Sequence, residues 1–304
     1  MPTGLGNNKV MFIFKKIALL VLCVGICDQP TVAQRRASGV RQSSSVDKLV
    51  NVGGRRLFIN CSGEARKGMP VVVLDAGMGS TSDVWSLVQP KVAQFARVCS
   101  YDRAGMGKSD RAPQAHTSQD IVNDLHTILV RAKINPPYVL VGHSFGGMNV
   151  RLYASKYSKQ VVGMVLVDST HEDENNRMLA LLPPEILKKA RPEDMIVRTA
   201  EDIDFNKSVA QVRAANWHGD IPLIVLTRGS ATFNPNDYAV PSLAPKWEQI
   251  RLKLQQELVR RSSRGRQIIA EKSGHYIQRD QPELVIDAIR QVMEEAKSKA
   301  NRKQ

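Results

Sequence analysis

A serine between two glycines is the first residue of this sequence whose setting suggests chemistry. Residues 142–146 read G-H-S-F-G; they follow an apolar run at 138–141 and precede a helical pattern. Glycines at 142 and 146 allow a strand to turn sharply into a helix without a collision of side chains. Such a turn raises the Ser144 hydroxyl above the sheet edge, beside a helix N-terminus that favours an oxyanion. The motif therefore predicts Ser144 as a nucleophile.

A nucleophilic serine needs a general base, and His275 has the most suitable position among the six histidines. It lies in the loop 273–276, after the last predicted strand and before the last predicted helix. Such a loop lies at the carboxyl edge of a parallel sheet, where ligands bind and where Ser144 is also expected. The other histidines lie on or beside helices, in the predicted turn, or at the ends of the 169–220 segment (His116, His126, His143, His171 and His218).

Short β-branched runs alternate with helical patterns from Val46 onward, and these elements must position the two side chains. The predicted strands are 49–52, 56–60, 71–75, 97–101, 138–142, 161–168, 223–227 and 267–271. Apolar residues spaced so that they fall on one face of a helix predict a helix over 121–132, with Thr117 as its cap. The same spacing predicts a last helix around 284–292. Continuous apolar strands separated by amphipathic helices predict an α/β fold: a mostly parallel, eight-stranded sheet covered by helices on both faces. The first two runs, joined by Gly53-Gly54, predict an opening hairpin.

The segment 169–220 interrupts this alternation. It has a helical, mixed-charge pattern with prolines at 183, 184 and 192, and it shows no strand pattern. We interpret it as a helical lid inserted after the sixth strand, because insertions of this size are often functional. Its apolar residues Met178, Leu179, Leu181 and Leu182 either line a substrate pocket or pack against the sheet.

The first 33 residues have the pattern of a signal peptide. Lysines at 9, 15 and 16 precede an apolar run at 17–27, and a small residue, Ala33, marks a cleavage point. The run is shorter than the roughly 20 residues of a membrane-spanning helix. We therefore expect an exported protein, periplasmic or secreted, with an uncleaved membrane anchor as the alternative. Residues 34–45 predict a flexible lead-in, and 46–304 the folded domain.

Composition excludes several classes of protein. The 304 residues contain 42% hydrophobic and 24% charged residues, a balance typical of globular domains and not of disordered chains, coiled coils or multi-span membrane proteins. The net charge is +14, but the densest basic stretch, at 260–266, contains no aromatic residue that could stack on bases. We therefore expect no nucleic-acid partner, and at most weak attraction to anionic surfaces. The oligomeric state is left open.

No metal or cofactor site is expected. The tripeptide His171-Glu172-Asp173 lacks the i, i+4 histidine pair of a zinc helix, and no CxxC pair is present. Gly105 and Gly107 lack the third glycine of a dinucleotide-binding turn.

Two further stretches complete a family resemblance. Residues 74–79 read L-D-A-G-M-G after the third predicted strand, and residues 101–110 read Y-D-R-A-G-M-G-K-S-D after the fourth. With the serine turn and Gly274-His275, they resemble the α/β-hydrolase superfamily from about Val46 to the end of the chain. In particular, they resemble its lidded serine esterase and aminopeptidase-like branch, which carries a D-R-x-G-x-G-x-S loop.

The resemblance implies a role for each matching residue. Ser144 is the implied nucleophile, and His275 the general base and later the general acid. The implied oxyanion hole consists of the backbone N–H groups of Phe145 and Met78. The loop before Met78 reads Ala76-Gly77 where the family usually has His-Gly, but the donor is a backbone group, so the function is expected to survive.

The acid of the triad has more than one candidate. Most relatives place it just after the seventh strand, where this chain has no carboxylate before Asp237. Other branches take it from the end of the sixth strand, where this chain has Asp168. We favour Asp168, with Asp237 as the alternative; Glu172 and Asp173 also remain open. The chain order Ser, acid, His suits all of them.

The resemblance also bears on the cysteines. Removal of the leader would leave Cys61 and Cys99, which lie at the second and fourth strands, and these strands are neighbours in this fold. We therefore expect a disulfide between them in an exported protein. Two buried free thiols are the alternative.

We expect an ester hydrolase that acts on a small-molecule substrate through an acyl-enzyme. An aminopeptidase-like amide hydrolase is one alternative, and it needs a carboxylate in the insertion to hold the substrate amine. A non-catalytic binding protein on this fold is another. Haloalkane dehalogenases and epoxide hydrolases carry an aspartate nucleophile at the turn, so Ser144 argues against both. Carboxylates of the insertion that could hold an amine are Glu172, Asp173, Glu174, Glu185, Glu193, Asp194, Glu201, Asp202 and Asp204.

Overall fold

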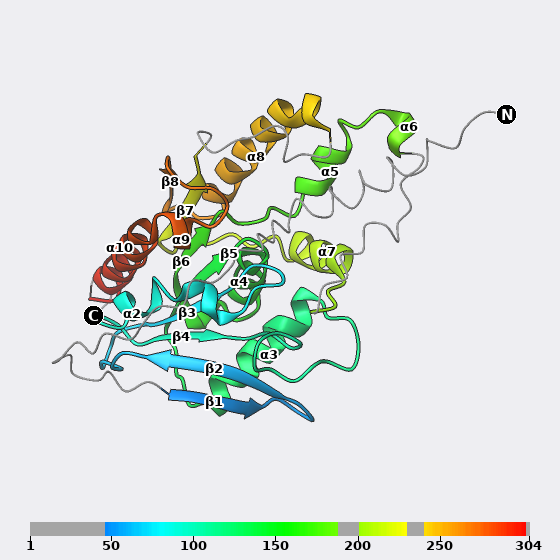
Figure 1. Ribbon diagram of the computed structural model, residues 1–304. Helices are drawn as coiled ribbons and strands as arrows, with labels where there is room; N and C mark the ends of the chain where they lie inside the picture. The colour runs from blue at the N-terminus through cyan, green and yellow to red at the C-terminus, as the bar shows by residue number, and fades with distance from the viewer. Residues whose placement is uncertain (1–45, 188–200, 230–239, 302–304) are drawn as a thin grey trace, which may run out of the picture.

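Eight strands form a single mixed sheet at the centre of the molecule. The structure, a computed structural model, describes residues 46–187, 201–229 and 240–301. The strand order is β1-β2-β4-β3-β5-β6-β7-β8; β1, β2 and β4 pair antiparallel and the other pairs are parallel (Figure 1). The strands are β1 (Val46–Asn51), β2 (Arg56–Ser62), β3 (Val71–Asp75), β4 (Val98–Tyr101), β5 (Tyr138–His143), β6 (Val161–Val167), β7 (Leu223–Arg228) and β8 (Gly265–Ala270).

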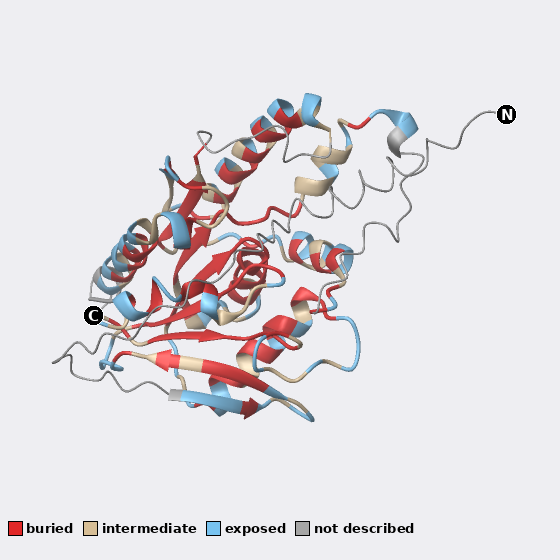
Figure 2. Ribbon diagram, in the orientation of Figure 1, coloured by how far each residue is buried: buried red, intermediate tan, exposed pale blue. Residues whose placement is uncertain are grey.

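The predicted sheet is confirmed, and so is the opening hairpin. Each of the eight predicted runs corresponds to one strand, with ends that differ by a few residues. The central strands β3, β4 and β5 are buried at every position, which explains their continuous apolar runs (Figure 2).

Helices cover both faces of the sheet (Figure 1). One face packs against α3 (Ser118–Arg131), α4 (Phe145–Lys156) and α7 (Phe205–Ala215). The opposite face packs against α2 (Gln89–Val92) and α10 (Pro282–Asn301), with the short turns η1 (Ser82–Trp85) and α9 (Ile277–Asp280) beside them. A short turn, η2 (Ser158–Gln160), leads from α4 into β6.

The start of α3 follows directly from its sequence. The Thr117 side chain accepts a hydrogen bond from the Asp120 N–H, and the Asp120 carboxylate accepts one from the Thr117 N–H. This reciprocal capping satisfies two N–H groups that a helix start leaves without partners. The predicted cap is confirmed.

The segment between β6 and β7 is helical in its described parts: α5 (Glu174–Leu179), α6 (Pro184–Leu187) and α7. The apolar residues of its first part pack with Ala244 and Trp247 at the start of α8 (Ala244–Val259), which follows the turn η6 (Pro241–Leu243). The Trp247 indole N–H donates to the Met178 carbonyl at 3.0 Å. Helix α8 was not predicted, and it provides the surface on which α5 rests.

The predicted disulfide is present. Cys61 on β2 and Cys99 on β4 are directly paired across the antiparallel ladder, and their sulfur atoms are bonded. The predicted leader and lead-in lie outside the described residues. Among the helices that are described, none is long and apolar enough to cross a bilayer.

Candidate active site

Ser144 lies at the turn between β5 and α4, in a backbone conformation that few side chains adopt. Its φ is 52°, in the left-handed region, and its N–H and C=O are fixed by bonds to Val167 and Thr170 at 3.1 Å each. A Cβ atom at Gly142 would lie 2.6 Å from the Gly146 carbonyl oxygen. The two glycines of the motif are therefore required by their approach to each other, and this crossing holds Ser144 at the bend.

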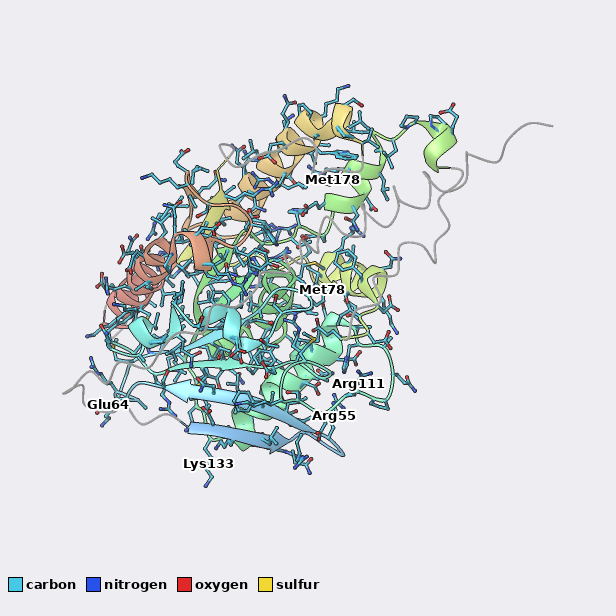
Figure 3. All side chains as sticks on the ribbon, viewed as in Figure 1. Arg55, Glu64, Met78, Arg111, Lys133 and Met178 are labelled. Carbon is cyan, nitrogen blue, oxygen red and sulfur yellow. A yellow bond between two sulfur atoms is a disulfide. The ribbon has the colours of Figure 1, made fainter. Side chains whose placement is uncertain are left out.

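The loop after β3 packs against the same turn. A Cβ atom at Gly146 would lie 2.4 Å from the Asp75 carbonyl oxygen, so the first turn of α4 contacts this loop backbone to backbone. A Cβ atom at Gly77 would lie 3.3 Å from the Ser144 Cβ. Gly77 therefore lies beside the serine, and Met78 (labelled in Figure 3) is the next residue in the chain.

Two backbone N–H groups near Ser144 have no hydrogen-bond acceptor among the residues that the structure describes. No described residue accepts a hydrogen bond from the Met78 N–H. Phe145 is the first residue of α4, so its N–H has no acceptor within the helix. Such a pair of N–H groups beside a serine suits the negative oxygen of a tetrahedral intermediate.

His275 lies in the loop after β8, at the same sheet edge as Ser144. Its Nδ1 is 2.7 Å from Asp168 Oδ2 at the end of β6. Its ring centroid is 4.6 Å from that of His143, the residue directly before Ser144. The His143 Nε2 also lies 2.9 Å from the His275 carbonyl oxygen, which fixes the His275 backbone to the serine turn.

Asp168 is buried and held by three groups. Oδ2 bonds to His275, while Oδ1 accepts hydrogen bonds from the Arg228 N–H at 3.2 Å and the Arg251 guanidinium at 3.1 Å. Burial alone would raise the pKa of Asp168, but the His275 hydrogen bond and the Arg251 charge outweigh it and hold the pKa well below its usual range. The carboxylate is therefore ionised at neutral pH and can orient the imidazole of His275.

The other acid candidates are placed differently. Glu172 forms buried ion pairs with Arg151 at 2.6 Å and Arg261 at 2.5 Å. Asp173 pairs with Arg213 at 2.9 Å. Asp237 lies outside the described residues.

Arg251 is a residue of the site that the sequence analysis missed. It lies on α8 with its side chain buried, and it bonds Asp168 and Glu248. A signal was available, because Trp247, Leu254 and Arg251 share one helical stripe, and an arginine on an apolar stripe needs a buried carboxylate.

His143 is uncharged in the folded protein. Burial, with a smaller effect from the neighbouring His275, lowers the pKa of His143 to about 3. The neutral ring therefore donates its Nε2–H to the His275 carbonyl, because a carbonyl oxygen can only accept.

No group of three or more metal-ligating side chains occurs in residues 46–187, 201–229 and 240–301.

The family model described as the alpha/beta hydrolase fold matches residues 70–279, more than half of the chain. The chain belongs to the α/β-hydrolase family.

Relatives of this α/β-hydrolase differ in what is known of them. It is 30% identical over 227 residues to the uncharacterized protein YqjL of Bacillus subtilis. The aligned region covers 74% of this chain and 84% of that protein. It is 26% identical over 183 residues to a proline iminopeptidase of Lactobacillus delbrueckii. That aligned region covers 57% of this chain and 59% of the iminopeptidase. A haloalkane dehalogenase variant from Bradyrhizobium elkanii shares the fold, with a TM-score of 0.58 and 14% sequence identity. The match covers 86% of this chain and 100% of the dehalogenase chain. The α/β-hydrolase family assignment supports a hydrolase that acts on a small molecule, and the relatives leave its substrate open.

The neutral state of His143 predicts how stability depends on pH. The pKa of His143 is lowered in the folded protein, so the unfolded chain binds the proton first and stability falls as pH drops below about 6.5. His171, whose pKa burial lowers to about 4, adds in the same direction. As the pH is lowered from 6.5 to 4.5, we expect the free energy of unfolding to fall by about 2 kcal/mol less in His143→Gln than in the wild type, because glutamine takes up no proton. Urea unfolding at several pH values measures this.

Exposed His218 provides the matched control, and His218→Gln should keep the pH dependence of the wild type. A His143→Gln protein that keeps the full wild-type pH dependence would contradict a neutral, buried His143.

Proposed function

We propose that this protein is a serine hydrolase that cleaves carboxylic esters through an acyl-enzyme, with Ser144, His275 and Asp168 as its triad. The observation that carries the proposal is the 2.7 Å contact between His275 Nδ1 and Asp168, beside the turn that presents Ser144. With Nδ1 directed to the carboxylate, Nε2 is the ring nitrogen left for the serine proton.

In the proposed reaction, the Ser144 oxygen attacks the acyl carbon while His275 Nε2 takes its proton. The carbonyl oxygen becomes an oxyanion that accepts hydrogen bonds from the Phe145 and Met78 N–H groups, each worth about 2.7–4 kcal/mol. Ionised Asp168 stabilises the imidazolium without taking its proton. The imidazolium then protonates the leaving alcohol, and water, activated by the same histidine, releases the acid.

Export and the role of the insertion belong to this proposal as well. A disulfide between Cys61 and Cys99 is typical of an oxidising compartment and supports removal of residues 1–33 on export. The helical insertion at 169–220 would act as the lid that shapes the substrate pocket.

An aminopeptidase-like activity is the second candidate, and one carboxylate of the insertion favours it. Arginines form ion pairs with three of these carboxylates, those of Glu172, Asp173 and Glu201, and the Asp204 side chain caps the start of α7. Glu174, at the start of α5, forms no ion pair within the described chain. Burial, with Asp168 nearby, raises the pKa of its carboxyl group. Because Asp168 and His275 lie near it, Glu174 is the carboxylate that this candidate assigns to the substrate ammonium.

The ester proposal predicts a clear mutational pattern with p-nitrophenyl acetate and butyrate. Ser144→Ala should lower kcat/KM by more than about 10³-fold, because the nucleophile is lost. Asp168→Asn should lower kcat by about 10⁴-fold, because the imidazole loses its orienting anion. Steady-state kinetics of the purified proteins measure both effects.

Two variants make this test specific. Exposed Asp287→Asn on α10 should stay within twofold of the wild type. Asp237→Asn should do the same; if it shows the large loss and Asp168→Asn does not, the acid has been assigned to the wrong residue. Unchanged turnover in Ser144→Ala would reject the proposed function.

The peptidase candidate makes a separate prediction. If it holds, prolyl p-nitroanilide is hydrolysed, and Glu174→Gln raises its KM at least about tenfold, because a buried charge-assisted contact to the amine is lost. Ester turnover stays within twofold in that variant, since an ester carries no amine. Exposed Glu185→Gln is the control. An equal loss on both substrates would contradict amine binding by Glu174.

A further inference from the structure

A buried arginine lies against the loop that carries the Met78 N–H. Arg103, whose side chain is 3% exposed, donates through Nη1 to Asp75 Oδ1 and to the Ala76 carbonyl, both at 2.6 Å. Its Nη2 donates to the Gly77 carbonyl, also at 2.6 Å. One guanidinium thus bonds the last residue of β3 and the two residues that precede Met78.

The bond to Gly77 acts on the peptide unit of the proposed oxyanion donor. The Gly77 carbonyl and the Met78 N–H belong to one planar trans peptide, so they point in opposite directions. A carbonyl held toward the buried guanidinium therefore directs the N–H away from it. A hydrogen bond from a charged donor also polarises the peptide and strengthens its N–H as a donor.

A carboxylate from the insertion completes this arrangement. Glu201, fully buried and 98 residues away in sequence, bonds Arg103 through Nε and through Nη2, the latter at 3.1 Å. The same Glu201 accepts the Gly79 N–H at 2.9 Å. The N–H after Met78 is therefore satisfied on the buried side, while the Met78 N–H has no acceptor among the described residues.

The side chain of Phe145, whose N–H is the second proposed donor, also lies near Arg103. The Arg103 guanidinium carbon lies 5.7 Å from the centroid of the Phe145 ring. Arg103 therefore bonds the peptide that precedes Met78 and also lies over the ring of Phe145.

We propose that Arg103, held by Glu201, is a positioning residue that orients and polarises the Gly77–Met78 peptide for oxyanion stabilisation. The inference rests on the proposed function and deepens it. It also gives the insertion a role in catalysis, since Glu201 supplies one of the two carboxylates, with Asp75, that hold Arg103.

The test uses Arg103→Lys and Glu201→Gln in the full protein. Lysine keeps the positive charge but cannot form the fork of bonds to Gly77, Ala76 and Glu201. We expect Arg103→Lys to lower kcat on p-nitrophenyl butyrate about 10- to 100-fold with KM within about threefold, somewhat less than loss of a whole oxyanion donor. Affinity for an alkyl trifluoromethyl ketone, whose serine adduct carries the oxyanion, should fall by the same factor. Glu201→Gln should show the same pattern with about a 3- to 10-fold loss.

Arg55→Lys is the matched control, because Arg55, at the β1–β2 turn, pairs with Asp124 on α3 and lies well apart from Met78 in Figure 3. It should leave kcat and ketone affinity unchanged. Thermal unfolding identifies a variant that fails to fold. If Arg103→Lys does not fold, the kcat and ketone affinity of Glu201→Gln test the proposal.

The possible outcomes distinguish a failure of the role of Arg103 from a failure of the proposed function. Wild-type kcat and ketone affinity in both folded variants would overturn the role of Arg103 while the Ser144 assignment stands. A loss confined to KM would overturn it too. A wild type without esterase activity would reject the proposed function, and this inference with it.

Discussion

The hydrogen bond between His275 and Asp168 is the interaction on which the account of this protein depends. It joins the loop after β8 to the end of β6, and it can form because parallel strands end at one edge of the sheet. The serine turn reaches that edge through β5, the neighbour of β6, and His143 ties it to the His275 backbone. The sheet order thus brings the serine turn, Asp168 and His275 to one edge of the sheet, and the glycines of the turn hold Ser144 at the bend.

Buried arginines provide a second layer of support around this edge. Arg251 holds one oxygen of Asp168 and so leaves the other for His275. Arg103 holds the carbonyl groups that precede Met78. A buried charge is costly unless it is paired, and each of these arginines contacts at least one buried carboxylate. In a chain of net charge +14, these arginines are committed to internal contacts and not to surface partners.

The sheet and the serine turn follow from local signals, whereas Asp168 was favoured as the partner of His275 through the family resemblance, with Asp237, Glu172 and Asp173 left open. The strands are continuous apolar runs, and the turn is a short motif whose glycines meet each other. Helix α8 was missed because its buried side carries Glu248, Arg251 and Gln255 among its apolar residues, which obscures the amphipathic pattern. Glu201 could not be singled out, because its partner lies 98 residues away and several carboxylates of the insertion looked equivalent. Those assignments that depend on residues 1–45 and on Asp237 remain predictions.

Covalent labelling followed by peptide mapping tests the central claim most directly. A fluorophosphonate reacts with a serine that has an activated hydroxyl and an adjacent oxyanion site, and its adduct is stable enough for mass spectrometry. We expect one adduct, on Ser144, that disappears in Ser144→Ala and forms far more slowly in Asp168→Asn. An adduct on another residue, or equal labelling of Ser144→Ala, would contradict it.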